Sequence, residues 1–204
     1  MQALMGFFKK KEEVKKYYKL DPKVLGTGNF AKVQRATLIA AERVLTKADG
    51  STISVPSEVA IKIIDKSKVE DMNDITREVE IMENCNHPNV IKLYEIFEEP
   101  KKMNLVMELV TGGELFDEIV SRGSYTEKDA ANVMATLASA LNYLHEKKIV
   151  HRDLKPENIL LANQPRPGEE PQIKVRSQTA HPERSDLMLS TSTSTYIRRW
   201  LTLG

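Results

Sequence analysis

The sequence contains a single cysteine, Cys85, among its 204 residues. One cysteine excludes an intrachain disulfide and a zinc site built from thiolates, and it favours a reducing compartment. An excess of charge of either sign is also missing, because 30 Lys and Arg stand against 29 Asp and Glu. The formal net charge of +1 gives no field that would favour nucleic acid or a membrane surface as a partner. The four histidines lack the spacing of a metal-ligand set; they are His87, His145, His151 and His181.

Long apolar runs are absent as well. No stretch approaches the ~20 residues that a membrane-spanning helix needs. The apolar start, Met1 to Phe8, is short, and lysines follow it instead of preceding it, which does not fit a signal peptide. We therefore predict a protein without a membrane span that resides in the cytoplasm, with the nucleus as an alternative.

Residues 1–16 form a lead-in of mixed charge. Five lysines between Lys9 and Lys16 alternate with Glu12 and Glu13. This pattern fits either a solvated lead-in helix or a basic helical face for acidic partners.

Residues 17–110 predict a small lobe made of strands and one helix. Apolar and polar residues alternate from Tyr17 to about Leu38, around a pair of glycines, and Ile75, Val79 and Met82 recur at helical spacing. Asp49-Gly50 marks a turn between two strands. The predicted elements are two strands within 17–38, an extended hairpin insertion at 39–58, a strand at 59–64, a helix at 71–84, and strands at 90–98 and 103–110.

Residues 111–175 predict part of a helical lobe. Thr126 to Asp129 is a capping-box pattern that begins a long helix. The apolar stripe expected on this helix consists of Ala130, Met134, Leu137, Leu141 and Leu144. Such a stripe needs partner helices, which this sequence does not encode. Strands first and helices afterwards predict an α+β fold in two lobes, joined near Gly112-Gly113.

The segment from Leu25 to Val33 lies between two predicted strands and carries Gly26 and Gly28. Glycines at these positions allow a backbone to approach phosphate oxygens closely. The third glycine position of the pattern is Ala31, so the motif alone also fits an ordinary hairpin.

Lys62 stands inside an otherwise apolar strand. A buried ammonium group needs an anionic partner, which Glu78 on the following helix can supply, and such a pair can hold the phosphates of a nucleotide. The alternative is that Lys62 points to solvent from an edge strand and that Glu78 is a solvated helix residue.

The string from His151 to Leu160 has the spacing H-R-D-L-x-x-x-N. In this spacing Asp153 can accept a hydroxyl proton, Asn158 can coordinate a metal, and Lys155 lies near the transferred phosphoryl group. Together with the glycine loop and Lys62, it makes residues 17–175 resemble the protein kinase family. Lys155-Pro156-Glu157 is similar to the serine/threonine branch, and Gly112 to Asp117 resembles the calcium/calmodulin-dependent group.

The resemblance implies ATP and Mg²⁺ as cofactors and a Ser/Thr protein as substrate. By resemblance, Met107 would border the adenine pocket, and the backbones of Glu108 and Val110 would bond the adenine edge. By the same resemblance, Glu114 and Glu157 would face a basic residue of the substrate peptide. The alternative is that both are acidic residues on the surface without this role. We group Glu114 with the residues of the nucleotide cleft. The side chains expected to sandwich the adenine ring are Leu25, Val33, Ala60 and Leu160.

The resemblance stops after the strand predicted at 171–175. A kinase continues there into Asp-Phe-Gly, whose aspartate holds magnesium. This sequence continues with Arg176-Ser-Gln-Thr, and its last phenylalanine is Phe116. Asn158 would be left as the only protein ligand for the metal, so we expect a truncated and inactive domain. Residues 176–204 hold five Ser and five Thr and predict a disordered tail, with a phosphoacceptor or docking tail as the alternative.

Two functions remain open from the sequence. The first is a serine/threonine kinase domain, truncated in this chain. The second is a pseudokinase-like module that binds nucleotide or a partner without turnover. A small-molecule kinase is disfavoured by Lys155-Pro156-Glu157. The sequence shows neither a regulatory helix nor an EF-hand loop, so the role of calmodulin stays open.

Overall fold

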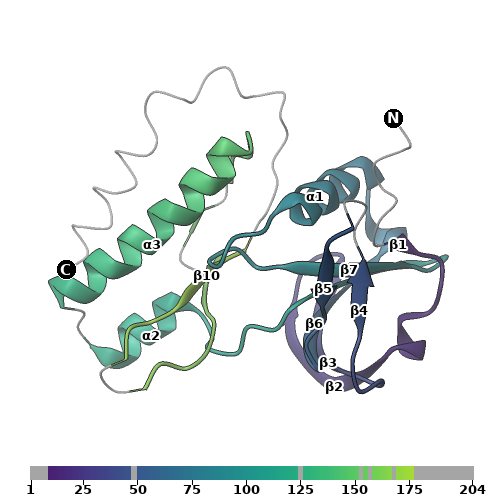
Figure 1. Ribbon diagram of the computed structural model, residues 1–204, viewed down its shortest axis with the longest axis horizontal. Coiled ribbons are helices and arrows are strands. Elements are labelled where there is room, and N and C mark those ends of the chain that lie inside the picture. The colour runs from purple at the N-terminus through teal and green to yellow at the C-terminus, as the bar shows by residue number, and fades with distance from the viewer. Residues whose placement is uncertain are drawn as a thin grey trace.

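The computed structural model describes residues 9–46, 50–123, 126–151, 154–155, 158–166 and 169–176. These residues form two parts (Figure 1), with the large sheet and α1 in one part and α2, α3 and β10 in the other. The predicted α+β, two-lobed architecture is therefore confirmed. Of the tail predicted at 176–204, only Arg176 is among the described residues, and the loop residues Asp153 and Glu157 lie outside them.

The small lobe is built on a six-stranded sheet in the order β1-β7-β8-β6-β3-β2. Its strands pair antiparallel, except that β1 runs parallel to β7. The strand β1 was not predicted, because two residues carry no periodicity. The bounds are β1 Lys9–Lys10, β2 Tyr18–Thr27, β3 Ala31–Leu38, β6 Glu58–Asp65, β7 Leu93–Glu98 and β8 Lys102–Glu108.

The helix α1, Met72–Asn84, covers one face of this sheet. It begins at Asp71, whose side chain accepts a hydrogen bond from the backbone N–H of Asn73 at 2.8 Å. Its buried residues are the predicted ones, Ile75, Val79 and Met82, and they pack with apolar side chains of β6, β7 and β8. Burial of this stripe fixes α1 against the strands that carry the candidate site.

The predicted insertion and the lead-in pack on the opposite face of the sheet. The predicted insertion is a hairpin of β4, Val44–Thr46, and β5, Thr52–Ser54, and Leu45 and Val55 pack onto the sheet. The lead-in adds Val14, which is 2% exposed, from the 3-10 helix η1, Val14–Lys16. The lead-in is therefore not the solvated helix considered from the sequence, because its apolar residue finds a place on the sheet.

The large-lobe part consists of α2, Leu115–Arg122, α3, Glu127–Glu146, and the antiparallel pair of β9, Ile159–Leu161, with β10, Ile173–Val175. The capping box is confirmed: Asp129 N–H donates to the Thr126 hydroxyl, and Thr126 N–H donates to the Asp129 carboxylate. The short helix α2 was not predicted. None of the helices among the described residues is long and apolar enough to span a membrane.

The stripe predicted on α3 is partly wrong. Ala130 is exposed, and Met134 and Leu141 are only half-buried. The buried stripe consists of Val133, Leu137, Ala140 and Leu144. It packs in one cluster with the buried apolar residues of β9 and β10 and with Leu115 of α2.

Candidate functional site

The glycine pair lies where β2 turns into β3. Gly28 N–H donates to the Ala31 carbonyl at 2.7 Å, which closes the turn. Neither Gly26 nor Gly28 has a positive φ, and a Cβ at Gly26 would meet no atom within 4 Å. The nearest atom to a Cβ at Gly28 is the Ala31 carbonyl oxygen, at 3.8 Å. Neither backbone conformation nor packing requires these glycines, so their small size suits close approach from outside the chain.

Lys62 and Glu78 form the ion pair expected from the sequence. The Lys62 Nζ lies 2.6 Å from the Glu78 Oε1, and the two side chains are 22% and 15% exposed. Lys62 lies in the interior of the sheet, where β6 is flanked by β3 and β8. The alternative of a lysine on an edge strand is therefore wrong. The pair joins the interior strand β6 to α1, and Lys62 stands opposite Val33 of β3, the strand that follows the glycine turn.

The residues expected around an adenine ring lie on adjoining strands and the joint. In the register of β3, β6 and β8, Val33 stands opposite Lys62, and Ala60 stands opposite Met107. Ala60 is 6% exposed, whereas Leu25 is 46% exposed at the end of β2. The backbone N–H of Val110 has no hydrogen-bond partner among the described residues. It remains available as a donor at the cleft edge.

Two groups contact the carboxylate of Glu108, one from β10 and one from the residue before β7. Its carboxylate lies 2.6 Å from the Lys174 Nζ of β10 and accepts from the backbone N–H of Lys92 at 3.3 Å. Its own N–H donates to the Lys92 carbonyl at 2.8 Å. These contacts fix the end of β8, which leads into the joint between the two lobes.

The strand β9 pairs with the segment that follows β8. Gly112 N–H donates to the Leu161 carbonyl at 3.0 Å, and Leu161 N–H donates to the Gly113 carbonyl at 2.9 Å. Glu114 and Leu160 are bridged through their backbones. A Cβ at Gly112 would collide with the Asn163 carbonyl and the Leu161 side chain, so glycine is required there. Leu160 and Glu114, both predicted cleft residues, are thereby brought next to the joint.

Two of the three predicted catalytic residues fall within the described part of the chain. Lys155 is exposed, and Asn158 is only 1% exposed. The Asn158 N–H donates to the Lys155 carbonyl at 2.9 Å, and the Arg176 N–H donates to the Asn158 carbonyl at 3.0 Å. Asp153, the expected base, lies outside the described residues.

The described residues do not by themselves fit a magnesium ion. Mg²⁺ prefers an octahedral set of oxygen ligands that includes carboxylates. Within the described ranges, no group of three or more His, Cys, Asp or Glu side chains is placed to hold a metal. Asn158 alone contributes a neutral amide oxygen. The described residues therefore do not complete a metal site.

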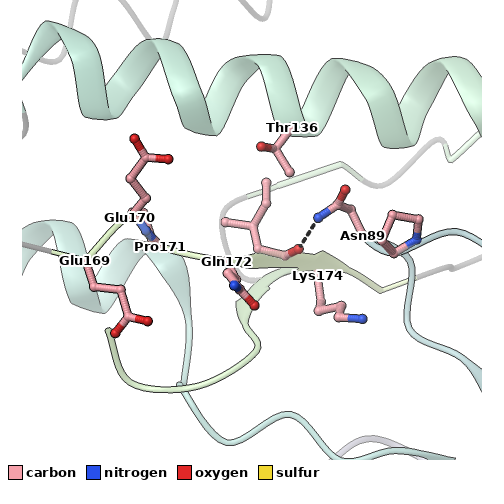
Figure 2. Close-up of a pocket in the computed structure, with 9 residues that line it drawn as sticks. Asn89, Thr136, Glu169, Glu170, Pro171, Gln172 and Lys174 are labelled. Atoms are coloured by element: carbon pink, nitrogen blue, oxygen red, sulfur yellow. Dashed lines mark hydrogen bonds between the residues drawn. The ribbon is translucent and has the colours of Figure 1, made fainter. Parts of the chain in front are cut away.

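A hollow of about 660 Å³ lies elsewhere, between α3, the loop before β7 and β10 (Figure 2). Asn89 borders it and donates from Nδ2 to the Ile173 carbonyl at 3.0 Å. None of its lining residues belongs to the predicted nucleotide set. The Lys62–Glu78 pair and the glycine turn, which the sequence predicts as the phosphate-binding residues, lie outside this hollow.

A buried charge cluster in the small lobe was missed from the sequence. Glu95 of β7 is fully buried and accepts from the Tyr18 hydroxyl and from Arg43 Nε and Nη2, at 2.6 and 2.7 Å. Burial and the hydrogen bond to Glu95 raise the pKa of Tyr18. The sequence signal that could have predicted this cluster is Glu95 itself, a charged residue inside an apolar strand, which is the same kind of signal that pointed to Lys62.

Comparison with known proteins agrees with this geometry. The model of the protein kinase domain matches residues 21–176. The chain is 44% identical over 149 residues to calcium-dependent protein kinase 5 of Plasmodium berghei, which covers 73% of this chain and 24% of that protein. It is 53% identical over 114 residues to myosin light chain kinase A of Dictyostelium discoideum, covering 55% and 39%. Calcium/calmodulin-dependent protein kinase type 1 of Macrobrachium nipponense is 41% identical over 153 residues, covering 74% and 40%.

The matched part is thus well under half the length of these relatives. Their names agree with the predicted resemblance to calcium/calmodulin-dependent serine/threonine kinases. Because the family model matches well over half of the sequence, this chain belongs to the protein kinase domain family.

Proposed function

We propose that this chain binds adenine nucleotide as a serine/threonine protein kinase domain does, and that it does not complete phosphoryl transfer by itself. The observation that carries the proposal is the Lys62–Glu78 ion pair at 2.6 Å. Glu78 holds the ammonium group in the cleft, where it can neutralise phosphate oxygens. Gly26 and Gly28 leave room for the same phosphates, and Val110 N–H faces no competing acceptor among the described residues.

Titration with a fluorescent ATP analogue tests the binding step. Lys62→Met should weaken binding tenfold or more, which corresponds to about 1.4 kcal/mol. The chain offers a matched control, because Lys66 forms a similar half-buried pair with Glu98 at 2.8 Å in the same lobe. Lys66→Met should leave the affinity unchanged. Equal affinities of the Lys62 and Lys66 variants would contradict the proposed site.

The parent activity of such a domain transfers the ATP γ-phosphoryl group to a Ser or Thr hydroxyl. In that reaction the hydroxyl oxygen forms the new P–O bond, the bond to ADP breaks, and Asp153 accepts the hydroxyl proton. Lys155 would lie near the transferred group. Asn158 would offer one amide oxygen to a metal, but the described residues supply no carboxylate cluster beside it, so the charge that would offset the phosphate oxygens is not held by this part of the chain.

The sequence after Val175 argues against transfer by this chain. It continues with Arg176-Ser177-Gln178-Thr179, where a kinase has Asp-Phe-Gly. A magnesium site without that aspartate forgoes several kcal/mol of transition-state stabilisation. We therefore also expect the affinity for the ATP analogue to change less than tenfold when magnesium is added.

An assay of phosphate transfer to a basic Ser/Thr peptide tests the second half of the proposal. The unmodified chain and Asp153→Asn should give the same signal. Turnover that disappears with Asp153→Asn or Lys62→Met would show that the chain is an active kinase, with another carboxylate on the metal.

The second candidate function is a non-catalytic binding module. The replacement of Asp-Phe-Gly favours a non-catalytic module over a kinase domain with low catalytic activity. A pull-down of a related full-length kinase, in which wild type and Lys62→Met are retained equally, would support partner binding without a role for nucleotide.

The substrate and the location of the protein stay proposals from the sequence. Glu114, half-buried and bridged to Leu160 at the joint, would contact a basic residue of a Ser/Thr peptide, and the cytoplasm is the proposed location. Glu114→Gln should weaken the binding of a basic peptide and leave a neutral peptide unaffected.

A further inference from the structure

The lead-in segment, residues 9–17, is attached to the small lobe although it precedes the part of the chain that matches the kinase family, residues 21–176. It adds β1 to the edge of the sheet, with Lys9 opposite Ile96 and Lys10 opposite Phe97. Within the described part of the lead-in, which begins at Lys9, these two residues are the ones that pair with β7. The segment is thus an addition to the domain, held by few backbone contacts.

Side chains supply the rest of the attachment. Val14 is buried, and its N–H donates to the Glu99 carboxylate at 3.3 Å. The Lys10 Nζ lies 4.9 Å from the centre of the Tyr17 ring, and 3.5 Å from the Glu95 carboxylate. The segment therefore docks through the Val14 side chain and amide, through the Lys10 cation, and through Tyr17. The centre of the Tyr17 ring lies 5.4 Å from that of Phe97 and 4.1 Å from the Arg43 guanidinium, and the Tyr17 carbonyl accepts from the Ile39 N–H at 2.9 Å.

The two cations that contact Glu95, Arg43 and Lys10, differ in their distance from the carboxylate and in their exposure. Arg43 from the insertion binds Glu95 through two nitrogens and has a side chain that is 13% exposed. Lys10 is farther from Glu95 and is 34% exposed. If Lys10 departs, Arg43 and the Tyr18 hydroxyl still satisfy the buried carboxylate. The segment can therefore leave without creating an unpaired buried charge.

The strand β7 connects this segment to the candidate site. Phe97 and Glu95 face the lead-in and the insertion, whereas Ile96 packs in the cluster that contains the buried side chains of α1. The helix α1 carries Glu78, the partner of Lys62. Figure 1 shows β1 and α1 at the same end of the sheet. One strand thus touches the lead-in on one side and the helix that positions the phosphate lysine on the other.

We propose that residues 9–17 form a releasable latch on β7 whose docking holds α1, and with it the Lys62–Glu78 pair, in the position that binds nucleotide. The coupling to nucleotide rests on the proposed function, but the release of the latch and the loosening of α1 do not. Undocking would expose the side of β7 that carries Phe97. It would also remove β1, one of the two strands that pair with β7, and leave β8 as the other.

The test uses the full chain with Lys10→Gln combined with Val14→Ser. The matched control is Lys11→Gln combined with Lys15→Gln, since both of these lysines are exposed and neither lies against Glu95. Amide hydrogen exchange is followed in residues 9–17, 72–84 and 44–55, and affinity is measured with the fluorescent ATP analogue.

In the latch variant, residues 9–17 should lose protection by about tenfold or more, and α1 by about threefold or more, while the hairpin changes by less than about twofold. The dissociation constant of the analogue should rise about threefold or more, and the control should match wild type.

Three results would overturn the proposal. Residues 9–17 could keep their protection, which means that the latch does not release. The hairpin could lose protection equally, which makes the segment an integral part of the fold. Residues 9–17 could exchange freely while α1 or the nucleotide affinity stays unchanged, which removes the coupling. If the unmodified chain binds no nucleotide, the proposed function is wrong. The latch is then tested by the amide hydrogen exchange of α1 alone.

Discussion

Replacing Glu95 with glutamine should be the most destabilising single polar substitution in the small lobe. Glutamine keeps the shape and an acceptor for the Tyr18 hydroxyl, but it removes the negative charge. Arg43, with a side chain 13% exposed, and Lys10 would then face each other without an anion. Breaking a buried ion pair by removing one partner costs about 3–5 kcal/mol. Arg43 also lies over the Tyr17 ring at 4.1 Å, which places the expected cost near the lower end, about 3 kcal/mol.

Urea unfolding measures this cost, and the chain provides a control for it. With a slope of about 2 kcal/mol per molar urea, a loss of about 3 kcal/mol lowers the midpoint by about 1.5 M. Arg35 and Glu58 form an ion pair on the same sheet, but their side chains are 43% and 47% exposed. Glu58→Gln should therefore cost less than about 1 kcal/mol.

A second variant separates charge from packing. Glu95→Gln combined with Arg43→Met removes both charges of the close pair, and it should recover most of the lost stability, because an apolar replacement of a buried pair is often neutral. If Glu95→Gln and Glu58→Gln prove equally mild, or if the double variant is worse than Glu95→Gln alone, the reasoning is refuted.

Three further predictions concern α3 and the residues that contact it. Thr126→Ala should destabilise the chain by about 1 kcal/mol through loss of the N-cap of α3, whereas Thr126→Ser should be neutral; equal urea midpoints for the two variants would contradict the cap assignment. Leu144→Ala should cost about 2–5 kcal/mol because the side chain is 1% exposed, whereas Val120→Ala, at 63% exposure, should cost less than about 0.5 kcal/mol, and calorimetry of both variants checks this difference. Burial lowers the pKa of His87, which stacks on Tyr143 at 5.0 Å, so the unfolded state binds the proton more readily and stability falls as the pH drops below about 6.5. His87→Asn should flatten that fall between pH 7.5 and 5.5, and an unchanged slope would show that His87 does not contribute.

Features that depend on neighbours in the sequence were the most predictable. The capping box of α3 and the stripe of α1 follow from residues three and four apart, and both are confirmed. The Lys62–Glu78 pair could be predicted because a lysine inside an apolar strand needs an anion, and the next helix offered one. The two lobes followed from the order of the patterns.

Features that depend on distant contacts were not predictable in the same way. Glu95 and Arg43 are 52 positions apart, and nothing local pairs them. The stripe of α3 was ambiguous, because two faces share Leu137 and Leu144, and only β9 and β10 decide between Ala130 and Val133. The insertion was correctly predicted as a hairpin, but its packing onto the sheet was not. Val44 and Leu45 are adjacent apolar residues, and nothing local shows that Leu45 is the buried one and Val44 the exposed one.

The cover on the outer face of the sheet also constrains how this sequence can evolve. Ile61, Ile63 and Phe97 share a buried cluster with Leu45 and Val55 of the insertion. A deletion of the hairpin would leave these strand residues facing water, and each large apolar side chain so uncovered forgoes about 1.5–3 kcal/mol. Polar substitutions in the strands would have to come first, yet each of them is harmful while the hairpin is present. The insertion is therefore entrenched, and lineages that carry it should retain it even where its loop sequence drifts.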